Sequence, residues 1–302
     1  LVTGANSQLG RAVRALAEKR GVVDSFDFAD CDEFDISNAS DYFKIDWTLY
    51  GTVVNCAAYS DVDAAETEAG RKVAWAINAQ GPALLAKVCT EHSIVLVHMS
   101  SSFVFDGVDK EHDETEPLSP LGAYGQTKAA GDIAVANCPK HYIVRSNWVI
   151  GNDENFVKTM AELSDRCADP ENCLNRVPVV DDQFGRLTFT RDVAEGIFWL
   201  LGYRDGDVEP SAPCEYGAYN LTGAGVAKSR AEIAAKIFNL RNGNSDAVTP
   251  VSSAEYCDII ERTVAARPIH SSLSLSKIAN AGYIPSDWEI GLVEYVCNGL
   301  SL

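Results

Sequence analysis

Short apolar runs alternate with amphipathic helical stretches along the first half of the chain. Such runs suit strands that are buried on both faces, and a helix between two strands returns the chain to the same edge of a sheet. The alternation predicts an α/β fold: a Rossmann-like doubly wound parallel sheet with helices on both faces. The expected strands lie in residues 1–4, 25–30, 51–58, 93–100 and 141–150, and the expected helices in 8–21, 61–92 (interrupted at Gly81-Pro82) and 125–137.

The alternation becomes less regular after residue 150, which predicts a smaller C-terminal substrate lobe interleaved with the first domain. We expect residues 1–150 to form a dinucleotide-binding domain that also receives roughly residues 177–222. Residues 151–176 and 223–302 are then expected to form the smaller, substrate-binding lobe.

The composition narrows the class of protein. A formal net charge of −18 over 302 residues repels phosphate backbones and disfavours nucleic-acid binding through a basic surface. No segment has the apolar length needed to span a bilayer, so no membrane partner is expected, and no basic-then-apolar leader is present. Nine scattered cysteines, odd in number and without a Cys-x-x-Cys pair, suit reduced thiols and a cytoplasmic location.

The first expected strand is short, because only Leu1 and Val2 precede the glycine-rich turn. A strand normally runs about five or six residues. We therefore expect that residues upstream of Leu1 were trimmed, are disordered, or belong to a longer polypeptide.

The glycine-rich turn GANSQLG lies between the first strand and the first helix. Gly4 and Gly10 permit a tight turn, and backbone amides at the helix start can hold a phosphate. The usual central glycine is replaced by Ser7, whose side chain narrows this approach while its hydroxyl can donate to the phosphate. Asp30 ends the second strand, where a carboxylate accepts hydrogen bonds from both adenosine ribose hydroxyls and repels a 2′-phosphate. The turn predicts NADH or NADPH as cofactor, with NADH favoured; the alternative is a solvated acidic turn.

Tyr124 and Lys128 lie four residues apart in AYGQTKAAG. On a helix this spacing places both side chains on one face, with β-carbons about 5–6 Å apart. A nearby ammonium favours the ionised phenol, so we expect Lys128 to lower the pKa of Tyr124. The serines of HMSSSFVFDG end the fourth strand, and ligands gather at the carboxyl ends of parallel strands. The glycine turn, the serines, Tyr124 and Lys128 are therefore expected to meet in one crevice.

At this point the chain resembles the dTDP-4-dehydrorhamnose reductase family of the extended short-chain dehydrogenase/reductase superfamily. Tyr-x-x-x-Lys is shared by the superfamily, whereas many of the other matching stretches are specific to this group. The resemblance runs over nearly the whole length, through VTGANSQLG, VVNCAAYSDVDAAE, AINAQGPALLA, SSSFVFDG, PLSPLGAYGQTKAAG, VRSNWVIG, NFVKTM, VVDDQFGRLTFT and YNLTG.

The resemblance implies roles for individual residues. Ser101 stands where the family has its catalytic threonine, Tyr124 would be the acid, and Lys128 would tune the phenol and anchor the ribose. The implied cofactor-binding residues are Gly4, Ser7, Gln8, Leu9, Gly10, Asp30, Asp35, Ile36, Ser37, Ala57, Ala58, Tyr59, Tyr124 and Lys128. The substrate-binding residues are expected to be Ser60, Ser102, Phe103, Trp148, Asn155 and Arg267.

Within these sets the resemblance implies more specific contacts. Gln8 and Leu9 would offer backbone to the pyrophosphate, and residues 35–37 would pack around adenine. Trp148 would stack against the hexose, and Arg267 would reach a substrate phosphate, with a surface arginine as the alternative.

The chain departs from the family after the fourth strand, where Ser-Thr-Asp-Tyr becomes Ser100-Ser101-Ser102-Phe103. Serine preserves the catalytic hydroxyl, but the polar contacts of the aspartate and the tyrosine are lost. Related nucleotide-sugar dehydratases place an Asp-Glu pair after the threonine to eliminate water, so Ser102-Phe103 disfavours elimination.

The expected activity is therefore reduction of dTDP-4-dehydro-6-deoxy-L-mannose (dTDP-4-dehydrorhamnose) to dTDP-L-rhamnose by hydride transfer from NAD(P)H. The alternative is a non-catalytic regulatory subunit that resembles the β subunit of methionine adenosyltransferase. Ser7 and the lost aspartate favour that alternative, whereas Tyr124 and Lys128 oppose it. The expected partner is a nucleotide sugar. Related reductases can form homodimers with Mg²⁺, and the sequence assigns no residue to a metal.

Overall fold

The computed structural model describes residues 1–302 apart from 173, 205–208, 211 and 262–263. Its centre is a six-stranded parallel sheet in the order β10-β5-β4-β3-β1-β2. Because β1 lies between β2 and β3, the chain winds first toward one edge and then toward the other, which makes β1 the switch point of a doubly wound sheet. The strands are β1 (Val2–Thr3), β2 (Phe28–Ala29), β3 (Thr52–Asn55), β4 (Val95–Ser101), β5 (His141–Ser146) and β10 (Gly217–Asn220).

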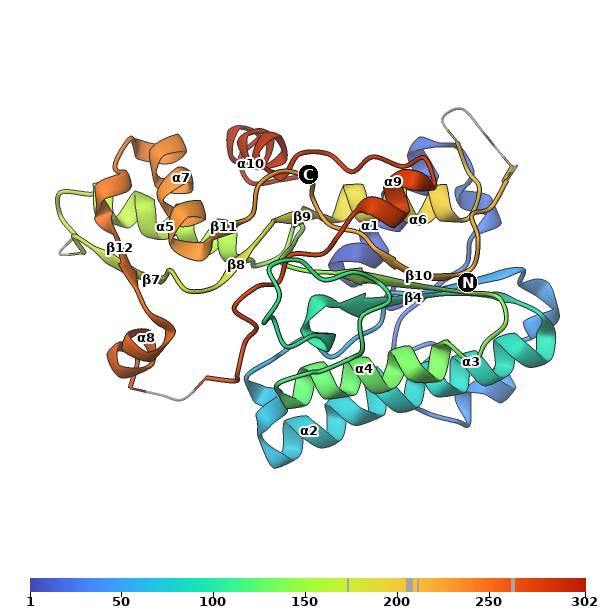
Figure 1. Ribbon diagram of the computed structural model, residues 1–302. Coiled ribbons are helices and arrows are strands. Elements are labelled where there is room, and N and C mark those ends of the chain that lie inside the picture. The colour runs from blue at the N-terminus through green and yellow to red at the C-terminus, as the bar shows by residue number, and fades with distance from the viewer. Residues whose placement is uncertain (173, 205–208, 211, 262–263) are drawn as a thin grey trace.

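Helices cover both faces of this sheet (Figure 1). One face carries α2 (Glu68–Trp75), α3 (Gly81–His92) and α4 (Ala123–Val135), and the other carries α1 (Gln8–Lys19), α6 (Thr190–Leu200) and the short α9 (Ser276–Asn280). Each face has its own apolar core, with Val13 and Phe198 on the α1 and α6 side and Leu85 on the α3 side. Strands buried from both sides must be apolar on both faces, which explains their nearly continuous apolar sequences. The predicted doubly wound α/β fold is confirmed.

The helical region after β3 continues through Gly81-Pro82, although the sequence predicted an interruption there. A π-helical turn at Ala76–Gln80 joins α2 to α3. Pro82 cannot donate a backbone hydrogen bond and its ring crowds the carbonyl of Asn78, four residues earlier. The wider π turn accommodates the proline while Gly81 keeps helical angles of φ −56° and ψ −55°.

A smaller lobe packs around α5 (Phe156–Ala168) and α7 (Arg230–Asn242), at the left of Figure 1. It also contains the parallel pair β7 (Val177–Val180) and β12 (Val248–Val251), with α8 (Ser253–Ile259) and α10 (Trp288–Cys297). The chain passes between the lobe and the sheet through short strand pairs. These are β6 (Val149–Ile150) with β9 (Thr188–Phe189), and β8 (Phe184–Gly185) with β11 (Lys228–Ser229).

Two segments pack on the other side of the expected lobe boundary. Val177 and Val179 of β7 contribute to the apolar core of the smaller lobe, because their partner strand β12 lies there. Ile278 of α9 contributes to the core beside the large sheet, where α9 contacts β10. We therefore propose the same two-lobe division with these two segments exchanged.

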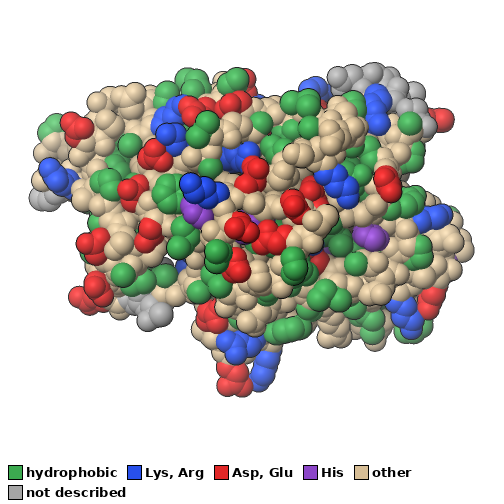
Figure 2. Space-filling model, in the orientation of Figure 1, with side chains coloured by type: hydrophobic (Ala, Val, Ile, Leu, Met, Phe, Trp, Pro, Cys, Tyr) green, Lys and Arg blue, Asp and Glu red, His purple; other side chains and the backbone are tan. Residues whose placement is uncertain are grey.

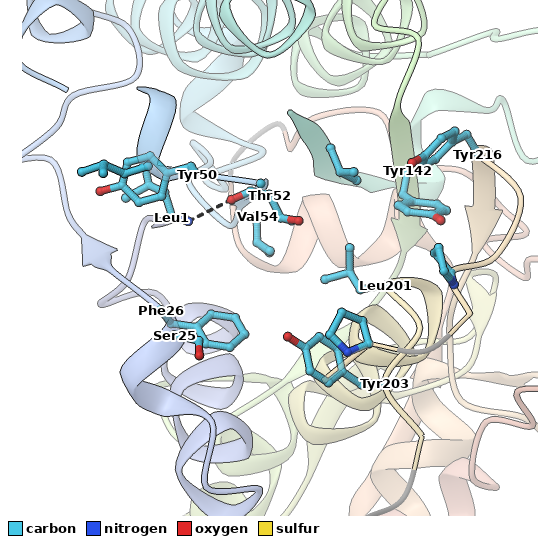
Figure 3. A pocket seen from close by; sticks show the side chains of 15 residues that line it. Leu1, Ser25, Phe26, Tyr50, Thr52, Val54, Tyr142, Leu201, Tyr203 and Tyr216 are labelled. Atoms are coloured by element: carbon cyan, nitrogen blue, oxygen red, sulfur yellow. Dashed lines mark hydrogen bonds between the residues drawn. The ribbon is translucent and has the colours of Figure 1, made fainter. Parts of the chain in front are cut away.

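The carboxyl and amino ends of the strands in the large sheet have different surroundings. The carboxyl ends of its strands face the smaller lobe, and the amino ends lie near the N-terminus at the right of Figure 1. A hollow of about 450 Å³ opens at the amino ends (Figure 3), lined by tyrosine rings that include Tyr142 and Tyr203. There the Leu1 backbone nitrogen donates to the Thr52 carbonyl at 2.9 Å. The predicted site residues lie at the carboxyl ends of the strands, so this hollow is separate from the candidate site.

Candidate active site

The glycine-rich turn forms a narrow cradle between β1 and α1. Gly4 has a positive φ of 63°, and a Cβ built on it would lie 2.5 Å from the Ala57 backbone nitrogen. A Cβ on Gly10 would lie 2.4 Å from the Gly4 carbonyl oxygen. Both positions therefore require glycine, and they bring the start of α1 close to the end of β3.

Ser7 serves α1 as its N-cap. Its hydroxyl accepts a hydrogen bond from the Gly10 amide at 3.0 Å, which stabilises the first turn of the helix. Gln8 and Leu9 follow as the first two helical residues, and their amides have no acceptor within the helix. These two amides are the donors that the sequence assigned to a pyrophosphate.

Asp30 connects the end of β2 to the glycine-rich turn. Its carboxylate accepts hydrogen bonds from the backbone amides of Asn6 and Cys31, both at 2.7 Å. Partial burial opposes ionisation, but these amide donors outweigh it and lower the pKa of Asp30. Asp30 therefore presents a negative charge beside the predicted dinucleotide site.

Residues 35–37 lie beyond β2. The Asp35 carboxylate accepts hydrogen bonds from the Ser37 amide and hydroxyl, both at 2.8 Å, and so closes a local turn. Ile36 is buried in the apolar core, where it faces Gly81 at the start of α3. The backbone of this turn, more than the Ile36 side chain, is the part available to an adenine ring.

The segment after β3 is held in place by Asn78, a residue that the sequence analysis did not single out. Asn78 accepts from the Tyr59 amide, and donates to the Tyr59 carbonyl, each at 2.9 Å. It also donates to the Thr127 hydroxyl on α4 at 3.1 Å. Ala57 is partly buried beside Gly4, whereas Ala58 and Ser60 are exposed. The π turn that carries Asn78 thus fixes this segment against the helix of Tyr124 and Lys128.

Ser101, Tyr124 and Lys128 come together as the sequence predicted. Ser101 is the last residue of β4, and its hydroxyl accepts a hydrogen bond from the Phe103 amide at 3.2 Å. The same hydroxyl lies close enough to the Tyr124 phenol to lower its pKa. Lys128 lies one turn farther along α4, where it is 2% exposed and its ammonium donates to the Met99 carbonyl of β4. A hydroxyl, a phenol and an ammonium therefore meet at the carboxyl end of β4.

The pKa of Tyr124 shifts in the direction opposite to the sequence-based expectation. Burial raises the pKa of the phenol, and the hydrogen bond from Ser101 offsets this only in part. Burial also lowers the pKa of Lys128 to about 8, although the nearby Asp132 carboxylate raises it. The desolvation of both groups, which a residue pattern does not reveal, therefore dominates over their charges.

A buried polar network lies behind this trio. Asp132, one turn beyond Lys128, accepts a hydrogen bond from Arg145 Nε of β5 at 3.0 Å. On the neighbouring strands, Asn55 accepts from the Thr3 hydroxyl at 2.8 Å and donates to His98 Nδ1 at 3.1 Å. Burial and the Lys128 charge hold the pKa of His98 well below its usual value. The Asn55 hydrogen bonds tie the end of β3 to the end of β1 and to the middle of β4, the strands that lead to Ala57, the glycine turn and Ser101.

Phe103 and Ser102 replace the polar residues of the family pattern. The Phe103 ring contacts the Tyr124 ring edge-on, with centroids 5.8 Å apart. Ser102 is 1% exposed, and its hydroxyl has no hydrogen-bond partner among the described residues. Phe103 and Tyr124 line a narrow crevice together with Ala266 and Pro268, the two neighbours of Arg267. Phe103 thus forms an apolar wall beside the phenol.

Trp148 and Asn155 follow β5 at the entrance to the smaller lobe. Trp148 adopts a positive φ of 41°, rare for a bulky residue, and its ring packs against Gly185. Asn155 was expected to contact substrate, but its side chain caps α5 by accepting from the Val157 and Lys158 amides at 3.0 and 3.1 Å. Its amide group also donates to three oxygens. Because both the oxygen and the nitrogen of its side chain are hydrogen-bonded within the protein, Asn155 stabilises the start of α5 in the smaller lobe.

A pocket of about 290 Å³ opens between the smaller lobe and the segment after β3. Arg267 lines it, as expected of a phosphate ligand, but forms an ion pair with Asp63 at 3.0 Å. Arg230, the first residue of α7, also lines the pocket and was missed by the sequence analysis, because an arginine at a helix start usually faces solvent. The other lining residues are Phe156, Thr159, Met160, Pro178, Val179, Val180, Gln183, Ser253, Tyr256 and Val264.

The described part of the chain offers neither a metal-binding cluster nor a helix suited to a membrane. No group of three or more His, Cys, Asp or Glu side chains in it is arranged to hold a metal ion. None of its helices combines the length and apolar character that crossing a membrane requires.

Comparison with known proteins gives a consistent result. Residues 1–300 match the family model described as the RmlD substrate binding domain. A dTDP-4-dehydrorhamnose reductase of Aggregatibacter actinomycetemcomitans is 32% identical over 309 residues, which cover 97% of this chain and 96% of the relative. The crystal structure of a dTDP-4-dehydrorhamnose reductase from Clostridium acetobutylicum has a TM-score of 0.83 at 31% identity and 98% coverage of both chains. The enzyme from Bacillus anthracis, solved in complex with NADP, has a TM-score of 0.79 at 29% identity and covers 98% of this chain and 96% of its own. The chain therefore belongs to the dTDP-4-dehydrorhamnose reductase family.

Proposed function

We propose that the protein is an NAD(P)H-dependent reductase that converts dTDP-4-dehydro-6-deoxy-L-mannose into dTDP-L-rhamnose. The observation that carries this proposal is that the Ser101 hydroxyl, the Tyr124 phenol and the Lys128 ammonium come together at the carboxyl end of β4. A hydroxyl and a phenol that share one face of a crevice can bind a single carbonyl oxygen and deliver a proton to it. Membership of the family supports the substrate class.

The reaction requires a hydride at C4 of the keto-sugar and a proton at its oxygen. A bound nicotinamide dinucleotide supplies the hydride. Tyr124 supplies the proton, because burial raises the pKa of its phenol and keeps it protonated at neutral pH. With substrate bound, the Ser101 hydroxyl turns its single proton from the phenol to the same substrate oxygen and donates to it as it becomes an alkoxide. The Lys128 ammonium stabilises the phenolate that remains, and this phenolate then takes a proton from water.

The cradle around Gly4 fits the pyrophosphate of a dinucleotide. A side chain at Gly4 would collide with Ala57, so glycine alone leaves this approach open. The Gln8 and Leu9 amides and the positive end of the α1 dipole favour a negative phosphate there. The nicotinamide end then extends past Ala57 toward Tyr124 and Lys128.

We propose that NADH is preferred over NADPH. The Asp30 carboxylate is held ionised at the end of β2, where it can accept from both ribose hydroxyls and repels a 2′-phosphate. Arg11, the nearby cation on α1, is paired with Asp153 and donates to the Asn6 carbonyl. These contacts leave the carboxylate as the dominant charge beside the turn.

The nucleotide part of the substrate is proposed to bind in the pocket between the lobes. Its apolar lining, with Phe156 and Val179, suits a pyrimidine base, and its two arginines suit phosphate. The Trp148 ring stacks on Arg230, which lines this pocket, and is proposed to stack against the hexose. The regulatory-subunit alternative has less support, because the relatives reported above are named reductases.

The remaining expectations concern assembly and location. The cysteines of the described residues are all free thiols, which supports the proposed cytoplasmic location. A homodimer and a role for Mg²⁺ stay predictions.

The decisive experiment is a panel assay. Purified protein is mixed with NADH or NADPH, and nicotinamide absorbance is followed with and without dTDP-4-dehydrorhamnose and other dTDP-linked 4-keto-6-deoxyhexoses. Oxidation that depends on the keto-sugar supports the proposal. A protein that binds either dinucleotide and oxidises neither with any keto-sugar is a regulatory subunit.

A further inference from the structure

Arg230 is held between aromatic rings at the wall of the pocket. Its guanidinium lies 4.6 Å from the centre of the Trp148 ring and 5.3 Å from that of the Phe156 ring. Its Nε donates to the Gln183 side-chain oxygen at 3.1 Å. Stacking and this hydrogen bond fix the plane of the guanidinium, so its orientation toward the pocket costs little entropy on binding.

The charge of the partly buried Arg230 has no carboxylate partner among the described residues, which sets it apart from Arg145 and Arg267. Arg145 is paired with Asp132, and Arg267, on the facing wall of the pocket, is paired with Asp63. Burial, and then the positive charge of Arg267, lower the pKa of Arg230 to about 10. An unpaired, partly desolvated cation is costly to a fold, so its presence indicates that something else supplies the counter-charge.

The residues around Arg230 leave a bound ligand as the source of the negative charge that would balance its guanidinium. The chain carries a net charge of −18, and acidic side chains gather near the middle of the face in Figure 2. The nearby acidic residues, Asp181 and Asp182, instead accept hydrogen bonds from Ser229 and Ser253. The pocket therefore combines two guanidinium groups with the single carboxylate of Asp63.

We propose that Arg230 binds the diphosphate of the nucleotide sugar and is the main determinant of affinity for it. This inference rests on the proposed function, and it names the residue that recognises the charged part of that substrate. A planar guanidinium donates two parallel hydrogen bonds to phosphate oxygens. Arg267, already neutralised by Asp63, contributes less.

The test compares three variants by calorimetric titration with dTDP. Arg230→Met removes the charge and keeps an unbranched side chain against Trp148, and Arg230→Lys keeps a charge without the planar fork. Arg241→Met is the matched control, because Arg241 lies on the same helix but pairs with Asp165. A charged hydrogen bond is worth enough to predict a roughly 10- to 100-fold weaker dTDP affinity for Arg230→Met. Arg230→Lys should recover part of this loss, and Arg241→Met should bind as wild type.

Thermal unfolding separates a binding role from a structural one. Replacing an unpaired buried charge with an apolar side chain relieves a desolvation cost, so Arg230→Met should melt at or above the wild-type temperature. It should also lose most of the stabilisation that dTDP gives the wild type. A melting temperature well below wild type in both Arg230 variants would show that the residue serves packing, and would overturn the proposal. Wild-type dTDP affinity in Arg230→Met, or no dTDP binding by the wild-type protein, would also overturn it.

Steady-state kinetics distinguish this inference from the proposed function. Arg230→Met should raise the KM for the keto-sugar nucleotide roughly 10- to 100-fold with little change in kcat, because the diphosphate lies away from the reacting carbon. If the wild-type protein turns over the keto-sugar and Arg230→Met has the same KM as wild type, the proposed function holds and the inference about Arg230 is refuted. Arg230-dependent dTDP binding without any turnover retains the inference and refutes the function.

Discussion

Asp132 lies one helical turn beyond Lys128 and forms a buried ion pair with Arg145, with 3.0 Å between Asp132 Oδ2 and Arg145 Nε. Asp132 and Arg145 are 2% and 5% exposed, so solvent screens neither charge. The carboxylate faces two cations, and it raises the pKa of Lys128 against the effect of burial.

Asp132→Asn should therefore destabilise the protein and weaken the charge on Lys128. Removing one partner of a buried pair costs roughly 3–5 kcal/mol, measured as the free energy of unfolding in urea. Asp165→Asn, which breaks an exposed pair with Arg241, should cost less than about 1 kcal/mol. Equal losses in the two variants would contradict the assignment of the buried pair.

The activity should fall as pH rises through about 8, because the Lys128 ammonium, with a pKa near 8, loses its proton there. Below that pH the charge is present and kcat/KM should be level until other groups titrate. In Asp132→Asn the pKa of Lys128 falls further, so the alkaline limb should move to lower pH. A wild-type profile that stays flat well above pH 8 would exclude this role for Lys128.

Tyr124→Phe should nearly abolish turnover while leaving NADH binding unchanged. A positioned proton donor typically contributes about 10²- to 10⁴-fold in rate, and phenylalanine keeps the ring contact with Phe103. Single-turnover rates and quenching of protein fluorescence by NADH measure the two properties separately. Turnover at the wild-type rate would refute Tyr124 as the acid.

The role of Ser101 can be tested with two replacements that differ in one hydroxyl. Ser101→Thr should retain activity within about threefold, because the hydroxyl that bonds Tyr124 is kept. Ser101→Ala should lower kcat roughly 10- to 100-fold through the lost hydrogen bond to the reacting oxygen. Circular dichroism should show the same fold in both, and similar activity of the two variants would argue against a catalytic hydroxyl.

Asp30→Asn should shift the cofactor preference toward NADPH. The amide oxygen can still accept from the Asn6 backbone, but the repulsion of a 2′-phosphate is gone. The ratio of kcat/KM for NADPH to that for NADH should rise by about tenfold. A ratio that does not change would place the adenosine ribose away from Asp30.

Much of the fold and of the candidate site could be predicted, because the relevant signals are local. Alternating apolar and amphipathic segments predicted the sheet, and a spacing of four residues placed Tyr124 beside Lys128. The glycine turn could be located because a side chain at Gly4 or Gly10 would collide with neighbouring backbone atoms.

The features that escaped prediction depend on tertiary contacts. The pKa of Tyr124 is set by burial that no pattern of neighbours reveals. Asn155 has the residue type of a ligand, yet its position just before α5 makes it a cap. Arg230 became a candidate only when α7 was placed against Trp148, a residue far away in the chain.

The π turn before Pro82 makes the α2–α3 segment beside the large sheet sensitive to chain length. Such a turn holds one residue more than an α turn, so deleting a residue from Ala76–Gln80 would restore a regular rod. Because the wider turn accommodates its extra residue with little change in helical phase, the two ends of the rod would keep their relative orientation, and only the side chains of the former π turn would shift. Asn78 could then no longer reach both Tyr59 and Thr127. The extra residue therefore serves to present Asn78, and a shortened helix would be regular but would point the Asn78 amide away from the segment after β3.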